Sequence, residues 1–481
     1  MNRLLIKYRN LSAPMKASLW FAVCNILQKG IVYFSTPIVI RILPTDQFGE
    51  YTVFQSWYQI VSVFATLNLS AGVFNNGLTK FNADKKRFIG AMQGLSTSTT
   101  ALLLVFFATM PQFWESLLKL NGLLILGMFV QMFFEPAFLF WAAEQRYMYK
   151  YSSLVAITVI MTLGSTIAGI LTVLYIECKA ETYILSFVSV HTLIGICFYI
   201  NNLRKGRIFY DSKYWKYALN FNLPLIPHYL SMTVLNQSDR IMIGAMVGKA
   251  EAGIYWVAYT TAMLMTIVTT AINNSFIPYT YKSLKAKNYK DIKGISNSLL
   301  MIVGSGCIGA MAFAPELIKV FAEAEYYDAI WAMPPVAASA YFMFLYPFFA
   351  NVEFYYEKTK FIMIASCVGA ITNIILNYIF IGLFGYLAAG YTTLICYILF
   401  AFAHYLFYKK IIREEIQTVK GLYDIRFILF FSLLIIVAMI GITLIYNNLL
   451  VRYIILISLV IVAICNRKRV LKLFESIKTP A

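Results

Sequence analysis

Four charged side chains lie inside long apolar stretches of the chain, where charge is rare. Asp239 and Arg240 are neighbours within LNQSDRIMIG. Lys29 and Glu135 interrupt two other apolar runs. If these runs cross a membrane, each lipid-exposed charge costs roughly 2.5–3.5 kcal/mol, and four cost on the order of 10–14 kcal/mol, comparable to the stability of a domain. These side chains must therefore face the protein interior, pair with one another, or line water.

The positions of these charges indicate their partners. Lys29 and Glu135 each lie near the middle of an apolar run, so we expect them to form an ion pair, and Pro136 should free backbone carbonyls beside it. Neighbouring residues on a helix point about 100° apart, so Asp239 and Arg240 do not face each other and need other partners. Two interpretations stay open: a water-filled cavity of net basic character, or buried pairs that fix the helices in register.

Polar residues and a histidine extend the feature around Arg240. Asn236, one turn before Arg240, begins a polar NQSDR run in the outer half of the segment. His228 adds a titratable group toward its inner half. Pro224 and Pro227 are expected to bend this helix, and a moving helix bundle can flex at such a bend. The candidate cavity residues are therefore Arg240, Lys29, Asp239, Glu135 and His228.

The elements that must position these residues are apolar segments long enough to cross a bilayer. The chain has 481 residues, 60% hydrophobic and 13% charged, whereas soluble proteins are about 45–50% apolar and ~25% charged. A spanning helix needs ~20 apolar residues. We identify fourteen segments, at about 17–40, 51–69, 88–110, 122–142, 152–174, 182–200, 218–247, 254–278, 294–314, 331–352, 361–381, 386–407, 427–446 and 449–465. The sequence predicts an all-α polytopic membrane protein, since the alternating pattern of barrel strands is absent.

The net charge of +18 is distributed as in a membrane protein rather than as in a nucleic-acid-binding protein. If the N-terminus is cytoplasmic and the segments alternate, 32 of the 40 Lys and Arg residues lie in cytoplasmic segments and six in outer loops. This bias follows the positive-inside rule, and basic cytoplasmic loops also attract anionic membrane lipids. The two basic residues left inside segments are Lys29 and Arg240. We therefore expect cytoplasmic N- and C-termini and no nucleic-acid partner.

A short motif repeats between the two halves of the chain. FGEYTV (48–53) follows the first segment and AGIYWV (252–257) follows the seventh, and both read Gly-x-Tyr-x-Val. The offset of 204 residues covers six segments, and an even number keeps the halves in one orientation. Parallel repeats hold their binding site near the membrane midplane. We expect two six-helix lobes around a central cavity, residues 1–217 and 218–408, and two additional helices with a basic cytoplasmic tail, residues 409–481.

Motifs for several other chemistries are absent from the sequence. Gln28 and Lys29 interrupt the N-terminal apolar run, which we expect to be a retained first helix rather than a signal peptide. The seven cysteines include no CxxC pair and predict neither a disulfide nor a metal site. No hydrolytic triad, Gly-rich phosphate loop or metal-ligand cluster appears. We expect no catalytic residue, metal or cofactor, and energy from an ion gradient, the membrane potential or the substrate gradient.

Three stretches resemble the polysaccharide transporter family, which is the Wzx-type O-antigen flippase branch of the multidrug, oligosaccharidyl-lipid and polysaccharide exporter superfamily. They are LPTDQFGEYTVFQS (43–56), LPLIPHYLSMTVLNQSDRIMIGAMVGKAEAGIYWVAY (223–259) and AEYYDAIWAMPPV (324–336). The second stretch is the most specific, and its Asp239 and Arg240 match the polar motif in the family's seventh helix. Together with the number of segments, the resemblance covers nearly the whole chain.

The resemblance implies fourteen helices, two six-helix lobes and a central cationic cavity. It implies the transfer of a polyprenyl-pyrophosphate-linked oligosaccharide from the inner to the outer leaflet of a bacterial cytoplasmic membrane by alternating access. The cargo would be an O-antigen, capsule or exopolysaccharide repeat unit, and the glycan polymerase and glycosyltransferases of that pathway would be partners. Fixed cations such as Lys29 and Arg240 suit a pyrophosphate, and a polar route suits a sugar headgroup.

Two other functions stay open at this point. An ion-coupled multidrug exporter of the same superfamily would need an acidic cavity for cationic drugs, whereas the apolar segments hold two acids and two bases. A membrane enzyme such as a glycan polymerase or ligase would need longer loops than this chain has. Asp239 either holds its helix in register or carries a proton, and the sequence does not choose between these roles.

Overall fold

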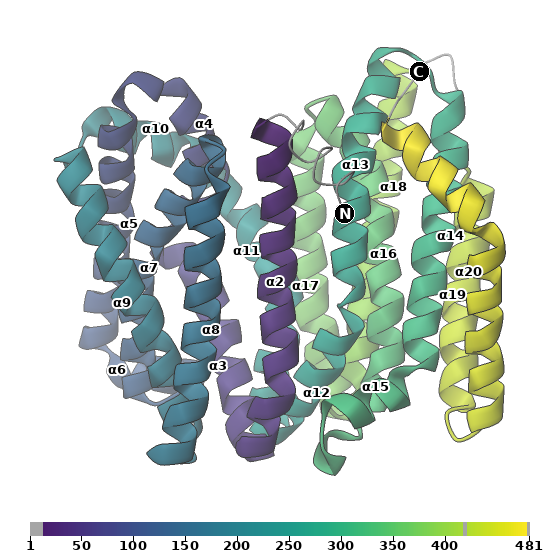
Figure 1. Cartoon of the computed structure of the whole chain (residues 1–481), viewed down its shortest axis with the longest axis horizontal. Helices are drawn as coiled ribbons and strands as arrows, with labels where there is room; N and C mark the ends of the chain where they lie inside the picture. The colour runs from purple at the N-terminus through teal and green to yellow at the C-terminus, as the bar shows by residue number, and fades with distance from the viewer. Residues whose placement is uncertain (1–12, 417–420, 479–481) are drawn as a thin grey trace, which may run out of the picture. The chain divides into compact units, whose positions relative to one another are not determined.

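The chain is helical throughout the residues that the structure describes. A computed structural model describes residues 13–416 and 421–478, and no strand occurs within them. The first helices are α2 (Ala13–Ile42), α3 (Thr45–Ala65), α4 (Gly72–Lys80), α5 (Lys85–Thr109), α6 (Pro111–Leu118), α7 (Gly122–Tyr147), α8 (Tyr151–Tyr175), α9 (Ala180–Gly206) and α10 (Ser212–Asn222) (Figure 1). The others are α11 (Ile226–Met246), α12 (Lys249–Ala262), α13 (Met265–Lys285), α14 (Lys290–Ala312), α15 (Ala314–Phe321), α16 (Ala329–Tyr355), α17 (Thr359–Phe384), α18 (Ala388–Glu415), α19 (Ile425–Leu444) and α20 (Leu449–Lys478). The prediction of an all-α protein is confirmed.

Two compact units divide the described chain, with their boundary between Thr233 and Val234. The first unit contains α2 to α10 and the start of α11, and the second contains the rest of α11 and the helices that follow. α11 therefore contributes residues to both units. The two lobes expected at 1–217 and 218–408, with additional helices at 409–481, stay predictions.

In the first unit, α9 packs against α5, α7 and α8, and α2 packs against α8. Glycines let α5 and the end of α9 approach closely. A Cβ on Gly90 would lie 2.7 Å from the carbonyl oxygen of Ile208. A Cβ on Gly206 would lie 2.7 Å from the carbonyl oxygen of Lys86. Small residues at such contacts are typical of membrane helices, because they allow the backbones to meet.

α16 forms the centre of the second unit. It packs against α12, α13, α14, α18 and α19, and 83% of its most apolar window is buried. A helix that is apolar all round is expected at such a central position. In contrast, only 28% of the corresponding window of α19 and 6% of that of α20 are buried. These two helices present large apolar side chains outward, as lipid-facing helices do.

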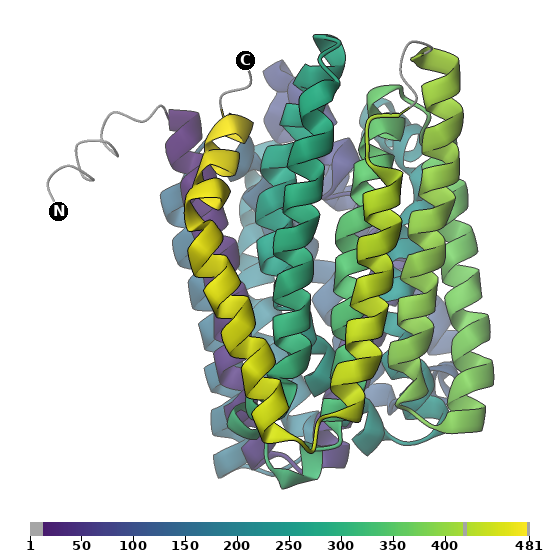
Figure 2. The ribbon, with the colours of Figure 1, turned by 90° about the vertical axis from the view of Figure 1, so that its right-hand side faces the viewer.

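The α19–α20 hairpin lies beside α14 (Figure 2). Near its turn, polar contacts bond the hairpin to α14 and α15. Arg452 Nη1 donates to Glu316 Oε2 at 2.7 Å and to the carbonyl oxygen of Ala312 at 3.2 Å. The Tyr446 hydroxyl donates to the carbonyl oxygen of Met311 at 3.0 Å. Arg452, one of six basic residues predicted in outer loops, is thus a buried structural partner, with 4% of its surface exposed.

The number of membrane spans is close to the predicted fourteen. Eleven helices of the described chain are long and apolar enough to cross a membrane, or twelve if α12 and α13, bent by 42°, form one span. The predicted segments also include α3 and α11, which are helical but do not pass the same test. Both contain charged residues, with Asp46 and Glu50 near the start of α3 and Asp239 and Arg240 within α11. The count of fourteen is therefore approximate, and the chain is a multi-pass membrane protein.

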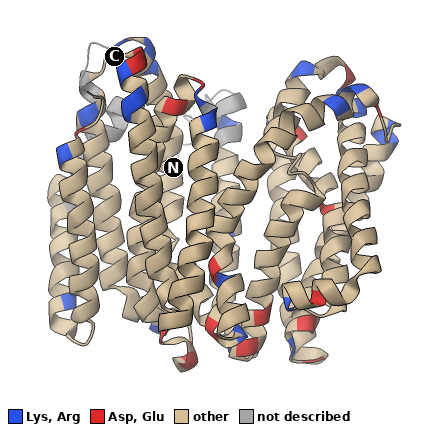
Figure 3. Cartoon of the chain, turned by 180° about the vertical axis from the view of Figure 1, so that it is seen from behind, with Lys and Arg blue, Asp and Glu red and all other residues tan. Residues whose placement is uncertain are grey.

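Basic residues gather at one end of the first unit, where α4, α5 and α10 meet (Figure 3). The basic residues of these helices and of the adjacent end of α9 are Lys80, Lys85, Lys86, Arg87, Arg204, Lys205, Arg207, Lys213 and Lys216. Their ammonium groups also contact aromatic rings, as where Lys80 lies 4.7 Å from the centroid of Tyr217. The positive-inside rule predicts that this end of the first unit faces the cytoplasm.

Because α5 and α9 meet at glycines, the stability of the protein is expected to fall when one methyl group is added at this contact. Gly90→Ala should destabilise the protein by about 1–3 kcal/mol, because the added Cβ overlaps backbone that cannot move aside. Gly441→Ala in α19 is the matched control, since nothing lies within 4 Å of its Cβ position. Thermal unfolding of the detergent-solubilised variants measures the difference. Equal melting temperatures for both variants would contradict the close contact.

Candidate functional site

Asp239 is buried inside the second unit and accepts three hydrogen bonds. None of its surface is exposed. The hydroxyl groups of Tyr255 and Thr393 donate to Oδ2 at 2.8 and 2.7 Å. The side-chain amide of Asn377 donates to Oδ1 at 2.7 Å. These donors come from α12, α18 and α17, so one carboxylate joins three neighbouring helices to α11 without leaving an unpaired polar group.

Two amides one turn apart on α17 extend this cluster. Asn377 also donates to Asn373 Oδ1 at 3.3 Å, and Ser238 donates to the same oxygen at 2.5 Å. The Thr392 hydroxyl donates to Asn377 Oδ1. All of these side chains are buried. The α11 network, as we call this cluster, consists of Ser238, Asp239, Tyr255, Asn373, Asn377, Thr392 and Thr393.

Arg240 is buried beside the α11 network but has partners of its own. Its Nη1 donates to Gln237 Oε1 at 2.5 Å, one turn earlier on α11. Its guanidinium lies 4.2 Å from the ring centroid of Tyr259, which is a cation–π contact. Its Nε has no hydrogen-bond partner among the described residues. Arg240 therefore keeps donor capacity for an anion that reaches it.

The structure brings Asp239 and Arg240 together as neighbours within one buried region of the second unit. Their exposed fractions are 0% and 5%. A substrate or water molecule can reach them only if the packing around α11 opens. Their expected role as cavity residues stays a prediction, since it concerns a state in which that packing has changed.

Glu135 has a different partner from the one expected, and the predicted Lys29–Glu135 ion pair is wrong. The Tyr58 hydroxyl donates to Glu135 Oε2 at 2.5 Å, and the Gln131 amide donates to the same oxygen at 2.7 Å. His191 Nδ1 lies 3.2 Å from Oε1. The partners of the carboxylate therefore come from α3, α7 and α9 within the first unit, and Lys29 is not among them.

Lys29 lies near the middle of α2 with its side chain exposed. No ion pair or hydrogen bond to it occurs among the described residues. An ammonium group at this depth cannot face acyl chains cheaply. Lys29 is therefore a cation that needs water or an anion from outside the protein.

His228 lies in the first turn of α11 and belongs to the first unit. It is half-buried, and its ring lies 6.0 Å from that of Tyr229. It precedes Asp239 by eleven residues, about 16 Å along the helix. The structure therefore does not bring His228 to the α11 network, and its expected cavity role stays a prediction.

Sequence reasoning missed most of the partners of these charges. Nothing in the sequence around His191 distinguishes it as a partner of Glu135, yet the two side chains pair. Asn373 and Asn377 carried a usable signal, because two amides one turn apart in the apolar run TNIILNY must face the same side of a helix. Tyr255, from the repeated Gly-x-Tyr-x-Val motif, proves to be a hydrogen-bond donor to Asp239.

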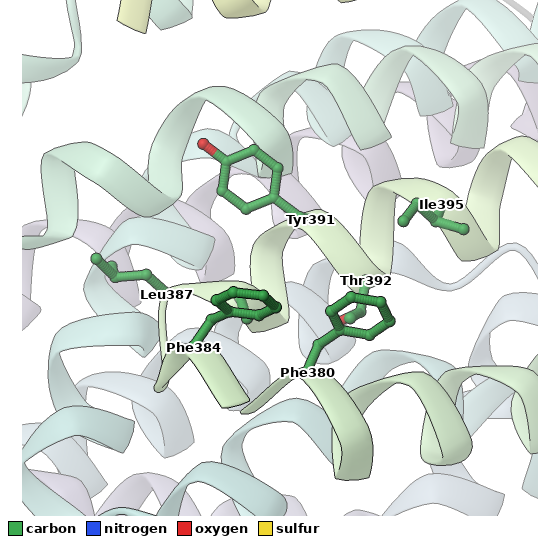
Figure 4. Close-up of a pocket in the computed structure, with 7 residues that line it drawn as sticks. Phe380, Phe384, Leu387, Tyr391, Thr392 and Ile395 are labelled. Carbon is green, nitrogen blue, oxygen red and sulfur yellow. The ribbon is translucent and has the colours of Figure 1, made fainter. Parts of the chain in front are cut away.

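An apolar groove of about 320 Å³ lies next to the α11 network (Figure 4). It is formed by the end of α17 and the start of α18. The residues that line it are Phe380, Phe384, Leu387, Ala388, Tyr391, Thr392 and Ile395. Thr392 links the groove to the network, since its hydroxyl donates to Asn377. The lining suits a hydrocarbon chain rather than a sugar.

The polar side chains offer few positions for a metal. In the part of the chain that the structure describes, no three His, Cys, Asp or Glu side chains gather into a metal-binding group. The α11 network places one carboxylate among amide and hydroxyl oxygens, which are hard donors. Chemically, the network can accommodate a single positive charge, a proton or a small cation, beside Asp239.

Comparison with known families assigns the chain to one of them. A family model described as polysaccharide biosynthesis protein matches residues 15–284, more than half of the chain. The chain belongs to the polysaccharide biosynthesis protein family. A second model, described as MatE, matches residues 224–379, which include Asp239, Asn373 and Asn377. The resemblance that the sequence motifs indicated is confirmed.

Two proteins of Haemophilus influenzae are similar to the chain. A protein of the Lsg locus is 31% identical over 160 residues, which cover 31% of this chain and 38% of that protein. A membrane protein is 22% identical over 370 residues, which cover 73% of this chain and 86% of that protein. The chain thus spans well under two thirds of the length of the first relative.

Solved structures of membrane transporters share the fold. The lipid II flippase MurJ, in an inward closed conformation, has a TM-score of 0.68 at 15% identity, with 92% of this chain and 100% of that chain covered. An inward-facing multidrug resistance MATE family transporter of the MOP superfamily has a TM-score of 0.60 at 14% identity, with coverages of 81% and 96%. The chain therefore has the fold of this transporter superfamily.

The three donors around Asp239 predict a large stability effect. Asp239→Ala should destabilise the protein by about 2–5 kcal/mol, because it leaves buried donors on three helices without an acceptor. Asp46→Ala removes the partly exposed carboxylate at the start of α3 and serves as the control, with an expected loss below ~1 kcal/mol. Denaturation in detergent measures both values. A similar small loss for both variants would show that the network contributes little to stability.

Proposed function

We propose that this protein is a flippase that moves a polyprenyl-pyrophosphate-linked oligosaccharide from the inner to the outer leaflet of a bacterial cytoplasmic membrane by alternating access. The cargo is an O-antigen, capsule or exopolysaccharide repeat unit. Family membership supports a role in polysaccharide biosynthesis. The fold it shares with a lipid II flippase supports a lipid-linked cargo.

One observation carries this proposal: Lys29 is an exposed and uncompensated cation in the middle of a membrane helix. The insertion cost of such a charge is roughly 2.5–3.5 kcal/mol, so it is retained for a function that offsets this cost. A pyrophosphate offers the anionic partner that the described residues do not supply. The lipid tail of such a cargo stays in the bilayer, and no covalent chemistry is needed.

The other candidate residues receive roles that follow from their contacts. Arg240 is a second cationic contact for the headgroup, reached when the packing around α11 loosens. Asp239 holds α11 against its neighbours and can carry a proton or small cation. Glu135 anchors the first unit through its three partners. His228, beside Pro227 at the start of α11, is a polar residue of the inner half of the route.

In the proposed function the protein lies in the cytoplasmic membrane and acts between the enzymes that build and polymerise the glycan. Both termini lie in the cytoplasm, which agrees with the basic end of the first unit (Figure 3). Glycosyltransferases that build the repeat unit act before this protein, and a glycan polymerase acts after it. The lobes at 1–217 and 218–408 undergo the alternating movement, and the helices of 409–481 form an additional part.

A multidrug exporter is the second candidate, because the MatE model matches residues 224–379. A cationic drug needs an exposed acidic group at membrane depth. The buried acids Asp239 and Glu135 are already satisfied by protein donors, whereas the exposed mid-helix charge is the cation Lys29. This charge pattern favours an anionic cargo. Drug resistance conferred on an efflux-deficient host, with no effect on surface glycan, would favour the exporter.

Deletion of the gene should cause lipid-linked repeat units to accumulate and surface glycan to disappear. Complementation with Lys29→Ala should restore export at least about tenfold less well than wild type, and Lys29→Arg should restore most of it, because the cation is retained. Lys205→Ala is the matched control, since Lys205 is exposed at the cytoplasmic end of α9. Normal surface glycan in a deletion strain without a second copy would refute the flippase function.

Arg240 provides an independent test of the cationic contacts. Arg240→Ala should reduce export several-fold at normal protein levels, because the headgroup loses a donor that protein partners leave available. Gln237→Ala removes the protein acceptor of Arg240 but keeps the charge, and is expected to reduce export less. Immunoblots of membranes control for protein level. Full export by Arg240→Ala would remove this residue from the mechanism.

A further inference from the structure

Two of the three histidines of the chain pair with a glutamate. His191 on α9 pairs with Glu135 on α7, and His404 on α18 pairs with Glu353 on α16. Among the predicted segments, α7 and α9 are the fourth and sixth of the first half, and α16 and α18 hold the same places in the second half. The same chemical pair therefore links the corresponding helices of each half.

The two pairs differ in how completely their polar atoms are bonded. Glu135 also accepts hydrogen bonds from Tyr58 and Gln131, and its side chain is 12% exposed. The side chains of Glu353 and His404 are 0% exposed, with Nδ1 2.8 Å from Oε1. Neither Glu353 Oε2 nor His404 Nε2 has a hydrogen-bond partner among the described residues. The pair in the second unit thus has two buried atoms at which a proton could be gained or lost.

Aromatic rings surround this pair. The His404 ring stacks on Tyr346 with 5.4 Å between centroids and meets Phe400 edge-on at 4.6 Å. Glu353 lies two residues before Tyr355, the last residue of α16. The pair is therefore enclosed but close to the end of the helix that the predicted topology places in the cytoplasm.

The other titratable groups near this end of α16 are exposed to solvent, paired with an opposite charge, or tyrosine hydroxyls. The exposed charges of α13, α17, α18 and α19 are Lys282, Lys285, Lys360, Lys409, Lys410, Arg413, Glu414, Glu415 and Arg426. Lys358 pairs with Glu414 and Glu415 at the surface. Lys293 of α14 lies 3.0 Å from Asp424 and lowers the pKa of that carboxyl group through a hydrogen bond.

Buried titratable groups near the pair are phenols, with one more distant carboxyl group. The phenols on the packed elements are Tyr279, Tyr397, Tyr408 and Tyr423, which are buried, and Tyr346, which is half-buried. Asp239 contacts α18 at Thr393, which is eleven residues from His404, or about 16 Å along the helix. Within the described residues, no further buried charge therefore contacts Glu353 or His404.

We propose that Glu353 and His404 form a binding site for one proton, and that this proton is coupled to the movement of the cargo in the flippase function proposed above. With a neutral ring, His404 donates Nδ1–H to Glu353 Oε1, and the pair carries one negative charge. A proton added at Nε2 converts the ring to an imidazolium and makes the pair neutral overall. No other bond forms or breaks.

Burial links this proton to the packing of α16 against α18. A net negative charge in an aromatic, water-free pocket is unfavourable, so the closed packing retains the proton. When water reaches the pair, the charge becomes solvated and the proton can leave. Proton binding and helix packing therefore influence each other reciprocally. The nearby end of α16 makes the cytoplasm the side that exchanges the proton.

Solid-state NMR of the full chain in lipid nanodiscs, with ¹⁵N-labelled histidine, tests the proton site at neutral pH. The chain contains three histidines, and H191Q and H404Q variants identify their signals. We expect His404 to carry protons on both ring nitrogens in the wild type and on one nitrogen in Glu353→Gln. A proton on the Glu353 carboxyl group instead, seen as an infrared C=O band absent from Glu353→Gln, also supports the site. A neutral His404 without such a band, unchanged by Glu353→Gln, overturns it.

Matched variants keep this test independent of folding. Glu414→Gln removes an exposed carboxylate at the same end of the unit and should leave the His404 signal unchanged. Glu353→Asp retains a carboxylate and should restore the doubly protonated ring. Size-exclusion profiles identify any variant that does not fold. A His404 signal that changes equally in Glu414→Gln also overturns the assignment to Glu353.

Export assays in the deletion strain separate the proton site from the proposed function. We expect Glu353→Gln to export several-fold less than wild type and to lose the response of export to collapse of the pH gradient by nigericin. An unchanged nigericin response in Glu353→Gln overturns the coupling. Normal glycan export without the gene refutes the flippase function, whereas the NMR result would still establish or refute the proton site.

Discussion

A charge that is buried inside an apolar segment must find a polar partner, and much of the arrangement of the second unit follows from that requirement. Asp239 obtains its donors from α12, α17 and α18. A helix that moved away would leave a buried donor or acceptor unpaired, which costs far more than the bond gains. The carboxylate therefore specifies which helices surround α11, beyond what apolar packing can specify on its own.

The need to satisfy polar groups in lipid also explains why the membrane spans could be predicted from the sequence. Apolar runs of ~20 residues identify spans because backbone groups in lipid must be bonded within a helix. The bias of Lys and Arg toward alternate loops indicates orientation for a similar reason. The estimate is least accurate for α3 and α11, which are helices but whose polar residues lower their hydropathy below that of a membrane span.

Partners were much harder to predict than spans, because they depend on how helices pack. Lys29 and Glu135 lie at similar depths in the sequence pattern, yet the carboxylate meets His191, Tyr58 and Gln131 instead. Nothing local to Glu135 indicates that α9 is its neighbour. The pair of amides at Asn373 and Asn377 was visible in the sequence, but its partner Asp239 lies more than a hundred residues away.

The α19–α20 hairpin has a consequence for the choice of membrane. It is bonded to α14 and α15 near its turn through Arg452 and Tyr446, and to α14 at the start of α19 through Asp424, whereas little of α20 is buried. With 20 residues, α19 is about 30 Å long. A bilayer of different thickness forces such a lipid-exposed hairpin to tilt, at a cost of a fraction of a kcal/mol per Å of mismatch. Hydrophobic mismatch at this hairpin thus makes bilayer thickness a variable to control in reconstitution, alongside lipid charge.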